Sequence, residues 1–320
     1  MGPRPLAVCI LFAASLSARA ASAEEPTAAP PEAPAPKKPA PPPYSLPWQL
    51  RPAIAATALR LDAAIALQDS ATTMASTFLG AYKIVPNFAG LVRLGVVHNA
   101  PDHASSASAF ANPLLGATFT PELAPGLRLP LFLGATLPVG SGGGNPANTL
   151  PGPNGKIAPP PSYAAEGAGI YARSAMDNAL FAVNYMAFIV GAGVAYMTHG
   201  LTVQAEVTLL QFARIRGSLI DKDETRTNLT SGLHVGYAIV KPLTVSAELR
   251  YQRWLSTPAA VVADDTKRDQ MTVGVGLRTR VDAVPDKVIL RPGVAYVTGV
   301  DDPMAKAGYH IIFVDLPVSF

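Results

Sequence analysis

Side chains alternate between apolar and polar with a period of two residues along much of this chain. The final segment shows the alternation clearly, because its polar side carries Tyr309, Asp315 and Ser319. The opposite side carries His310, Ile312, Val314, Leu316, Val318 and Phe320. Successive side chains of a β-strand point to opposite faces of a sheet, whereas those of a helix repeat about every 3.6 residues. The pattern therefore predicts β-strands with one apolar and one polar face.

Turn-forming residues bound twelve segments of this kind. The segments are Ala53 to Leu67, Thr72 to Ile84, Phe88 to Val97, Ser108 to Phe119, Leu127 to Val139, Tyr185 to Met197, Leu201 to Arg216, Leu229 to Val240, Leu243 to Leu255, Gln270 to Asp282, Val288 to Val300 and Gly308 to Phe320. An even number of strands returns both ends to the same side, as single-chain bacterial barrels require. We therefore expect an all-β fold, a transmembrane antiparallel up-and-down β-barrel of about 12 strands.

The connections between these segments agree with that fold. Every second connection is short, as at Pro86-Asn87, His199-Gly200 and Lys241-Pro242. The alternate connections include the longest one, Gly140 to Asn184. Outer-membrane barrels have short periplasmic turns and longer extracellular loops, so the lengths also predict which end of the barrel faces outward.

The polar faces of the strands carry charges that we expect to point into the lumen, because an Arg or Lys facing lipid at mid-depth costs about 2 to 4 kcal/mol. One interpretation is a polar permeation path that favours anionic or polar solutes. The other is that the charges pair across a narrow lumen and fill it. The expected lumen-lining residues are Arg60, Asp62, Glu206, Arg214, His234, Glu248, Arg250, Arg278, Arg280, Arg291 and Asp315.

Two segments precede the expected barrel. Residues 1–23 read as a secretory signal peptide, with an apolar run and the cleavage-type sequence Ala21-Ser22-Ala23. The only cysteine, Cys9, lies inside it, so the mature chain has no disulfide and no thiolate ligand for a metal. Residues 24–47 are rich in Pro and Ala and predict an extended periplasmic tether. Its lysines and stiff backbone suggest a contact with peptidoglycan.

Residues 48–320 form one expected domain, the barrel. Charged residues make up 15% of the chain, against about 25% in soluble domains. The mean hydropathy is positive. Both values suit a protein that lipid partly solvates. The formal net charge of +3 gives no reason to expect nucleic acid as a partner.

The long connection Gly140 to Asn184 is the expected functional loop. Its composition first favours turns, and a short helix is expected over Ala164 to Leu180. Such an extracellular loop either constricts the lumen or is disordered outside the cell. The residues expected in the constriction are Tyr163, Glu166, Tyr171, Arg173 and Asp177.

The nearly continuous apolar stretch Ala179 to Met197 has about the length of a transmembrane helix. Its polar and glycine positions, Asn184, Gly191 and Gly193, and the alternating sequence on both sides favour a strand instead.

Motifs for catalysis and metal binding are absent from the sequence. None of the five histidines has a neighbouring hydrolase or zinc-protease motif. His98 and His103 share one loop with Asp102. Such groupings are common in exposed loops and are weak evidence for a metal site. Asp221 to Glu224 lacks the spacing of a calcium loop. We expect no enzymatic activity, no metal and no cofactor.

The chain resembles bacterial outer-membrane channel proteins through its signal peptide, its strand alternation and its terminal Phe320. The resemblance covers everything after Pro47. It implies that Phe320, with Val318 and Leu316 on the same strand face, is the signal read by the barrel-assembly machinery. The passage LRLPLFLGATLPVGSGGGNP, from Leu127 to Pro146, looks like the strand and Pro-x-Gly of the phenol-degradation meta-pathway transporter family. That likeness implies uptake of small hydrophobic or aromatic molecules.

These resemblances imply a channel in the cell outer membrane for passive uptake of small solutes. Lipid and lipopolysaccharide are then its surroundings, and a small-molecule solute is its cargo. Two alternatives remain open at this point. One is a structural or adhesin-like barrel with a plugged lumen, and the other is an outer-membrane enzyme that acts on lipids.

Overall fold

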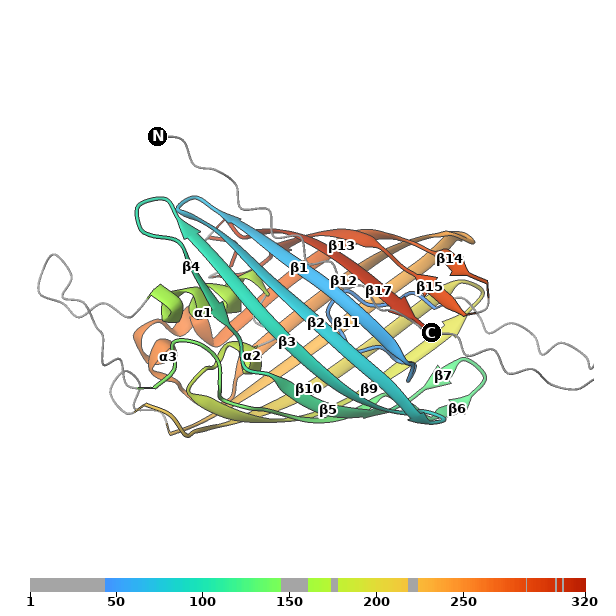
Figure 1. Cartoon of the computed structure of the whole chain (residues 1–320), viewed down its shortest axis with the longest axis horizontal. Coiled ribbons are helices and arrows are strands. Elements are labelled where there is room, and N and C mark those ends of the chain that lie inside the picture. The colour runs from blue at the N-terminus through green and yellow to red at the C-terminus, as the bar shows by residue number, and fades with distance from the viewer. Residues whose placement is uncertain are drawn as a thin grey trace, which may run out of the picture. The chain divides into compact units, whose positions relative to one another are not determined.

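The strands of this protein close into one antiparallel barrel (Figure 1). The computed structural model describes residues 44–320, apart from 145–160, 174–177, 218–223 and positions 286, 303 and 307. Closure is made by β1 (Ala58–Gln68), which pairs with β2 (Ala71–Val85) on one side and with β17 (His310–Ser319) on the other. A closed sheet has no free edge, so the backbone N–H and C=O groups of its strands find partners within the barrel.

The other strands follow in chain order around the barrel. They are β3 (Phe88–Pro101), β4 (Ala107–Phe110), β5 (Leu114–Phe119), β6 (Glu122–Ala124), β7 (Leu127–Arg128), β8 (Leu131–Thr136), β9 (Tyr185–Thr198), β10 (Leu201–Arg214), β11 (Thr225–Val240), β12 (Leu243–Trp254), β13 (Asp269–Thr279), β14 (Val281–Val284), β15 (Val288–Leu290) and β16 (Gly293–Gly299). The helices are α1 (Pro161–Ala172), α2 (Asn178–Phe181) and α3 (Ala259–Ala263), with a 3-10 turn at Asp265–Arg268.

Several of these short strands are pieces of one interrupted strand. Proline, which has no N–H to donate to a sheet, stands at most of the interruptions: Pro113 separates β4 from β5, Pro121 separates β5 from β6, Pro130 separates β7 from β8, and Pro292 separates β15 from β16. With these pieces joined, and with β13 joined to β14, the described residues form a barrel of twelve strands. The predicted fold class and strand count are therefore confirmed.

The two faces of the barrel differ as the alternation predicts. On β13 the outward Val275 and Leu277 are 55% and 48% exposed, whereas Arg278 is 4% exposed. On β12, Glu248 and Arg250 are buried between exposed apolar neighbours. The outer face is thus an apolar surface suited to lipid, and the polar side chains point into the barrel.

The two ends of the barrel also differ. One end holds tight turns such as the one between β9 and β10, where His199 and Gly200 both have positive φ. The three helices lie at the other end, away from the C-terminus (Figure 1). The apolar stretch around Ile189 is strand β9, and no helix among the described residues is long and apolar enough to cross a membrane.

Two element boundaries differ from the prediction. Residues 53–57 precede β1 rather than forming its start, and the Ala55 N–H there donates to the Thr120 side chain instead of to a neighbouring strand. The single helix expected over Ala164 to Leu180 is two helices, α1 and α2, and positions 174–177 between them lie outside the described residues.

A charge on the outer face should destabilise the barrel according to its depth. We expect Val275→Arg, in the middle of β13, to lower the free energy of unfolding by about 2 to 4 kcal/mol in lipid bilayers. Val281→Arg, near the turn end on β14, is the matched control and should cost about 1 kcal/mol or less. Urea titration of the protein in lipid vesicles measures both, and equal costs would contradict the assigned lipid-facing band.

Candidate functional site

Residues 44–57, here called the N-terminal segment, enter the barrel and contact its inner wall. The Ser45 N–H donates to Thr202 Oγ1 at 3.0 Å, and the Ala55 N–H donates to Thr120 Oγ1 at 3.0 Å. The segment also folds back on itself, since the Tyr44 hydroxyl accepts a hydrogen bond from the Ala53 N–H at 2.8 Å. The lumen near the turn end is therefore occupied by the chain's own N-terminal segment.

Trp48 is the largest buried side chain of the N-terminal segment and is 2% exposed. Its indole Nε1 donates to Ser246 Oγ at 2.9 Å. Its ring meets Phe313 edge-on at 6.1 Å between centroids, and the Arg278 guanidinium carbon lies 4.1 Å from the ring centroid. The backbone N–H of Trp48 donates to the Glu248 carboxylate. An apolar ring with a satisfied N–H is a strong anchor for a segment in a polar lumen.

Arg51 fixes the tip of the N-terminal segment against the opposite wall. Its guanidinium forms an ion pair with Glu206 and donates to Thr208 Oγ1 at 2.7 Å. The guanidinium carbon lies 3.9 Å from the centroid of the Phe132 ring. The Gln204 side-chain amide donates to the Arg51 carbonyl at 2.6 Å. The tip is thus held by charge-assisted bonds rather than by apolar packing.

Two aspartates on adjacent strands organise a group of buried arginines. Asp315 accepts a bidentate contact from Arg278 at 2.7 and 3.0 Å and lies 2.6 Å from Arg60. Asp62 pairs with Arg93 at 3.3 Å and with Arg173. The two aspartates face each other across the closure of the barrel, in register between β1 and β17. We call this group the ion-pair belt; it comprises Arg60, Asp62, Arg93, Arg173, Arg278 and Asp315.

Glu248 anchors a second polar group beside the N-terminal segment. It pairs with Arg250 at 2.5 Å, and His234 Nδ1 lies 3.3 Å from its carboxylate. His234 Nε2 in turn lies 3.1 Å from the Ser45 hydroxyl. The N-terminal segment therefore contacts charged residues of several strands.

The helix end of the lumen is occupied by the loop that carries α1 and α2. Helix α1 packs against β1, β2, β3 and β4. Arg173, just beyond α1, is fully buried, pairs with Asp62 and lies 5.3 Å from the Phe313 ring centroid. The carbonyl of Tyr171 accepts a hydrogen bond from the Tyr309 hydroxyl. The long loop thus folds into the barrel and meets the ion-pair belt.

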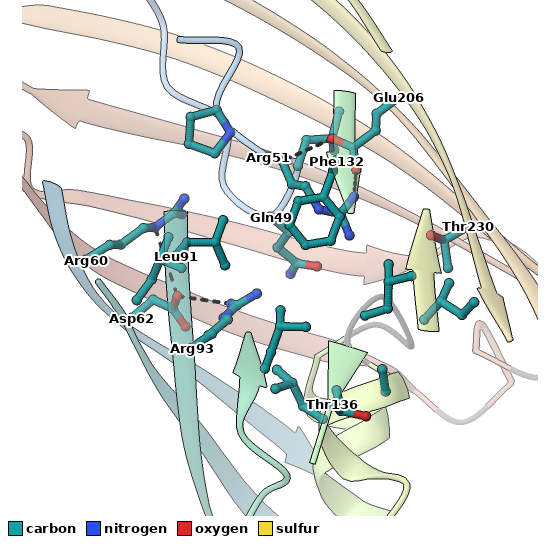
Figure 2. A pocket seen from close by; sticks show the side chains of 18 of the residues that line it. Gln49, Arg51, Arg60, Asp62, Leu91, Arg93, Phe132, Thr136, Glu206 and Thr230 are labelled. Atoms are coloured by element: carbon teal, nitrogen blue, oxygen red, sulfur yellow. Dashed lines mark hydrogen bonds and ion pairs between the residues drawn. The ribbon is translucent and has the colours of Figure 1, made fainter. Parts of the chain in front are cut away.

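A cavity of about 80 Å³ lies between the N-terminal segment and α2. Figure 2 shows Gln49 and Arg51 of the segment entering it opposite Arg93, with Phe132 beside Arg51. Leu180 of α2 lines the side of the cavity that faces the helix end. This central cavity has a mixed polar and apolar lining, and its volume accommodates only a few water molecules.

The predicted lumen residues do not all join these groups. Arg60, Asp62, Glu206, His234, Glu248, Arg250, Arg278 and Asp315 are buried on the inner face. Arg214 is half-buried near the helix end and donates to the Arg216 carbonyl at 3.3 Å. Arg291 is half-buried at the turn end, beside Ser319. Arg280 differs most from the prediction: it is exposed in the gap between β13 and β14 and pairs with Asp282, because the alternation breaks there.

Only some of the residues expected in the constriction can be placed inside the barrel. Glu166, Tyr171 and Arg173 lie inside the barrel. The Tyr163 side chain and Asp177 lie outside the described residues. The residues expected to form the assembly signal face outward at the end of β17, with Leu316 40% and Phe320 61% exposed.

Sequence reasoning missed the N-terminal segment, including Trp48 and Arg51, and the part played by Arg93. The segment has no period of two, so strand alternation says nothing about it. One signal was present in the sequence. A large aromatic and two polar side chains, Trp48, Gln49 and Arg51, lie between Pro47 and Pro52, and neither a solvated tether nor a strand with a two-residue period explains them. Within the described residues, no group of three His, Cys, Asp or Glu side chains has metal-binding geometry.

Comparison with known proteins gave matches among solved structures alone. No family model matches the chain, and no curated protein matches it. The chain is similar to an outer-membrane channel from Pseudomonas putida F1, with 12% identity, 85% of this chain and 97% of that chain covered, and a TM-score of 0.48. It is similar to the KdgM porin, with 10% identity, 82% and 99% covered, and a TM-score of 0.46. It is also similar to the NanC porin, with 8% identity, 82% and 98% covered, and a TM-score of 0.45.

Removing a carboxylate from the ion-pair belt should be costly. We expect Asp62→Asn to lower the free energy of unfolding by about 3 to 5 kcal/mol, because Arg93 and Arg173 then lose a buried countercharge. The control is Asp269→Asn, which breaks the exposed pair with Arg253 and should change stability far less. Urea unfolding followed by gel mobility tests this, and equal effects of the two variants would refute a structural role for the belt.

Proposed function

We propose that this protein is an outer-membrane channel for the passive uptake of small solutes. The observation that carries the proposal is the lining of the lumen, where polar and charged side chains surround inserted segments and a central cavity. A barrel needed only as a scaffold would be filled more cheaply with apolar side chains, since buried ion pairs often contribute little net stability. A polar interior suits a path that water and solutes enter.

The path is closed in two places in series. The N-terminal segment closes the turn end through Trp48 and Arg51, and α1 with Arg173 closes the helix end. Both closures are made largely of hydrogen bonds and ion pairs, and water that enters with a solute can take the place of these partners. Solute passage then requires that one or both inserted elements move, and the channel conducts weakly at rest.

The surroundings of the barrel follow from the same proposal. Lipopolysaccharide and lipid contact the apolar outer face, and the barrel-assembly machinery reads Phe320 with Leu316 and Val318. Residues 24–47 link the N-terminal segment to the periplasm, where peptidoglycan is the expected contact. We assign no catalytic reaction, no cofactor and no metal to the protein.

One observation favours a second candidate function, a structural barrel that never opens. The ion-pair belt and the N-terminal segment with Trp48 occupy much of the lumen, and the central cavity of about 80 Å³ is smaller than most solutes. The two candidates differ in a single measurable property, namely whether current flows when an inserted element is removed.

Single-channel conductance in planar bilayers separates the two candidates. We expect a low conductance for the chain without its signal peptide, and a several-fold higher conductance after deletion of residues 44–56 or of 145–178. Arg253→Ala, which alters an exposed pair outside the lumen, is the control and should conduct like the parent. Absence of current from all the folded variants would reject the channel and favour the structural barrel.

A further inference from the structure

A second, larger cavity lies at the helix end of the barrel. Its volume is about 230 Å³, and we call it the outer cavity. Helices α1 and α2 form one side, the ends of β9 to β12 form the other, and α3 with the adjoining turn lies across it. In Figure 1 these three helices gather at the same end of the barrel. A solute arriving from that side meets the outer cavity before the ion-pair belt.

Aromatic rings form one wall of the outer cavity. Tyr185 and Phe212 meet edge-on with their ring centroids 6.2 Å apart. Phe212 and Trp254 are 5.8 Å apart at an interplanar angle of 45°. Three linked rings, carried by β9, β10 and β12, provide a rigid surface for an apolar body, and their faces attract cations.

The outer cavity also presents buried polar atoms that have no hydrogen-bond partner among the described residues, on Glu166 and Asn178 of the helix side and on Gln252 of β12. These atoms are both carboxyl oxygens of Glu166, the Oδ1 of Asn178, and the Oε1 and Nε2 of Gln252. The three side chains are 1%, 4% and 1% exposed, and all three line the cavity. Once Glu166 is ionised, four of these atoms accept hydrogen bonds and one, the Gln252 Nε2, donates. An unsatisfied buried polar atom costs free energy, so the cavity favours a guest that donates hydrogen bonds.

Charge in the outer cavity is set by a few groups. Burial raises the pKa of Glu166 to about 9, so this carboxyl is neutral at pH 7. The other titratable groups in the lining are Tyr171, Tyr185, Arg226 and Lys267. The Arg226 guanidinium carbon lies 4.6 Å from the Tyr185 ring centroid, and Lys267 pairs with Asp264 at 3.6 Å. Glu166 is therefore the one acidic group in the described lining.

We propose that the outer cavity binds a small primary amine as its ammonium ion, with the charged head at Glu166, Asn178 and Gln252 and an apolar or aromatic body against the rings. An ammonium group carries three donors and no acceptor, which matches three acceptor side chains. The inference rests on the proposed channel function, because it names the solute class that the helix end of the lumen selects.

Binding moves one proton and forms no covalent bond. The ammonium ion displaces the proton of the Glu166 carboxyl into solvent, and the resulting carboxylate becomes its countercharge. The same step gives partners to acceptor atoms that have none among the described residues. A neutral alcohol of the same shape gains hydrogen bonds but no ion pair, and a carboxylate of the same shape adds acceptors where acceptors are already in excess.

Three probes with one body and different head groups test the proposal. They are 2-phenylethylamine, 2-phenylethanol and phenylacetate, titrated into the full refolded chain in detergent by calorimetry and followed by tryptophan fluorescence, since Trp254 lines the cavity. We expect the amine to bind at least about tenfold more tightly than the alcohol, and phenylacetate to bind most weakly.

Two variants and a pH series assign the effect to Glu166. Glu166→Gln should lower amine affinity to that of the alcohol, whereas Glu224→Gln, an exposed glutamate at the same end, should change nothing. Below pH 9 the amine must displace the Glu166 proton, so its affinity should rise about tenfold per pH unit between pH 6.5 and 8.5. This slope should vanish in Glu166→Gln. Heat-dependent gel mobility verifies that each variant is folded.

Other results would overturn the proposal. Equal affinities for amine and alcohol, unchanged in Glu166→Gln, would show a neutral aromatic site. Tightest binding of phenylacetate would make Arg226 or Lys267 the recognising group. Binding of none of the probes at millimolar concentration would reject the site. Binding in detergent requires no current, so its failure is distinct from a failure of the channel in the bilayer experiment.

Discussion

Every backbone polar group in the hydrocarbon region of a membrane needs a partner within the protein, and this constraint dictates the rest of the structure. A strand meets it only when the sheet closes, here through the pairing of β1 with β17. Closure divides the side chains of each strand into an outer apolar set and an inner polar set. The inner set then lies in a narrow space, where each charge requires a countercharge. The ion-pair belt is thus a consequence of closing a small barrel around charged strands.

The ion-pair belt also determines where the long loop and the N-terminal segment bind inside the barrel. Asp62 and Asp315 are neighbours in register, so two carboxylates on adjacent strands would repel each other without cations between them. Arg60 and Arg278 come from the wall, whereas Arg173 arrives with the long loop. The N-terminal segment enters beside this group and satisfies Glu248 and Glu206 through Trp48 and Arg51. The inner wall of the barrel and the two segments inserted into it, the N-terminal segment and the long loop, are therefore complementary in charge. This complementarity explains why the chain folds back into its own lumen.

The sequence predicted the strands of the barrel far better than the segments that fill its lumen. A strand buried on one face has a two-residue period, and this period located all twelve strands, including β9 in a stretch as apolar as a membrane helix. The period fails where the chain leaves the sheet. Arg280 was predicted inward by continuing the alternation of Arg278, but the strand breaks there and Arg280 turns to the surface. Trp48 and Arg51 were missed because their places depend on partners 155 to 200 residues away, at Glu206 and Glu248.

Helix α1 connects the outer cavity to the belt. Glu166 lies on the helix, and Arg173 follows its last residue by one position. Residues seven positions apart share a face of a helix, because seven residues make almost two full turns. The guest that we propose at Glu166 would therefore bind to the same helix that places the Arg173 guanidinium against Asp62. In the channel that we propose, solute recognition and the closure at the helix end therefore share one helix, whereas the closure made by Trp48 and Arg51 belongs to a separate part of the chain.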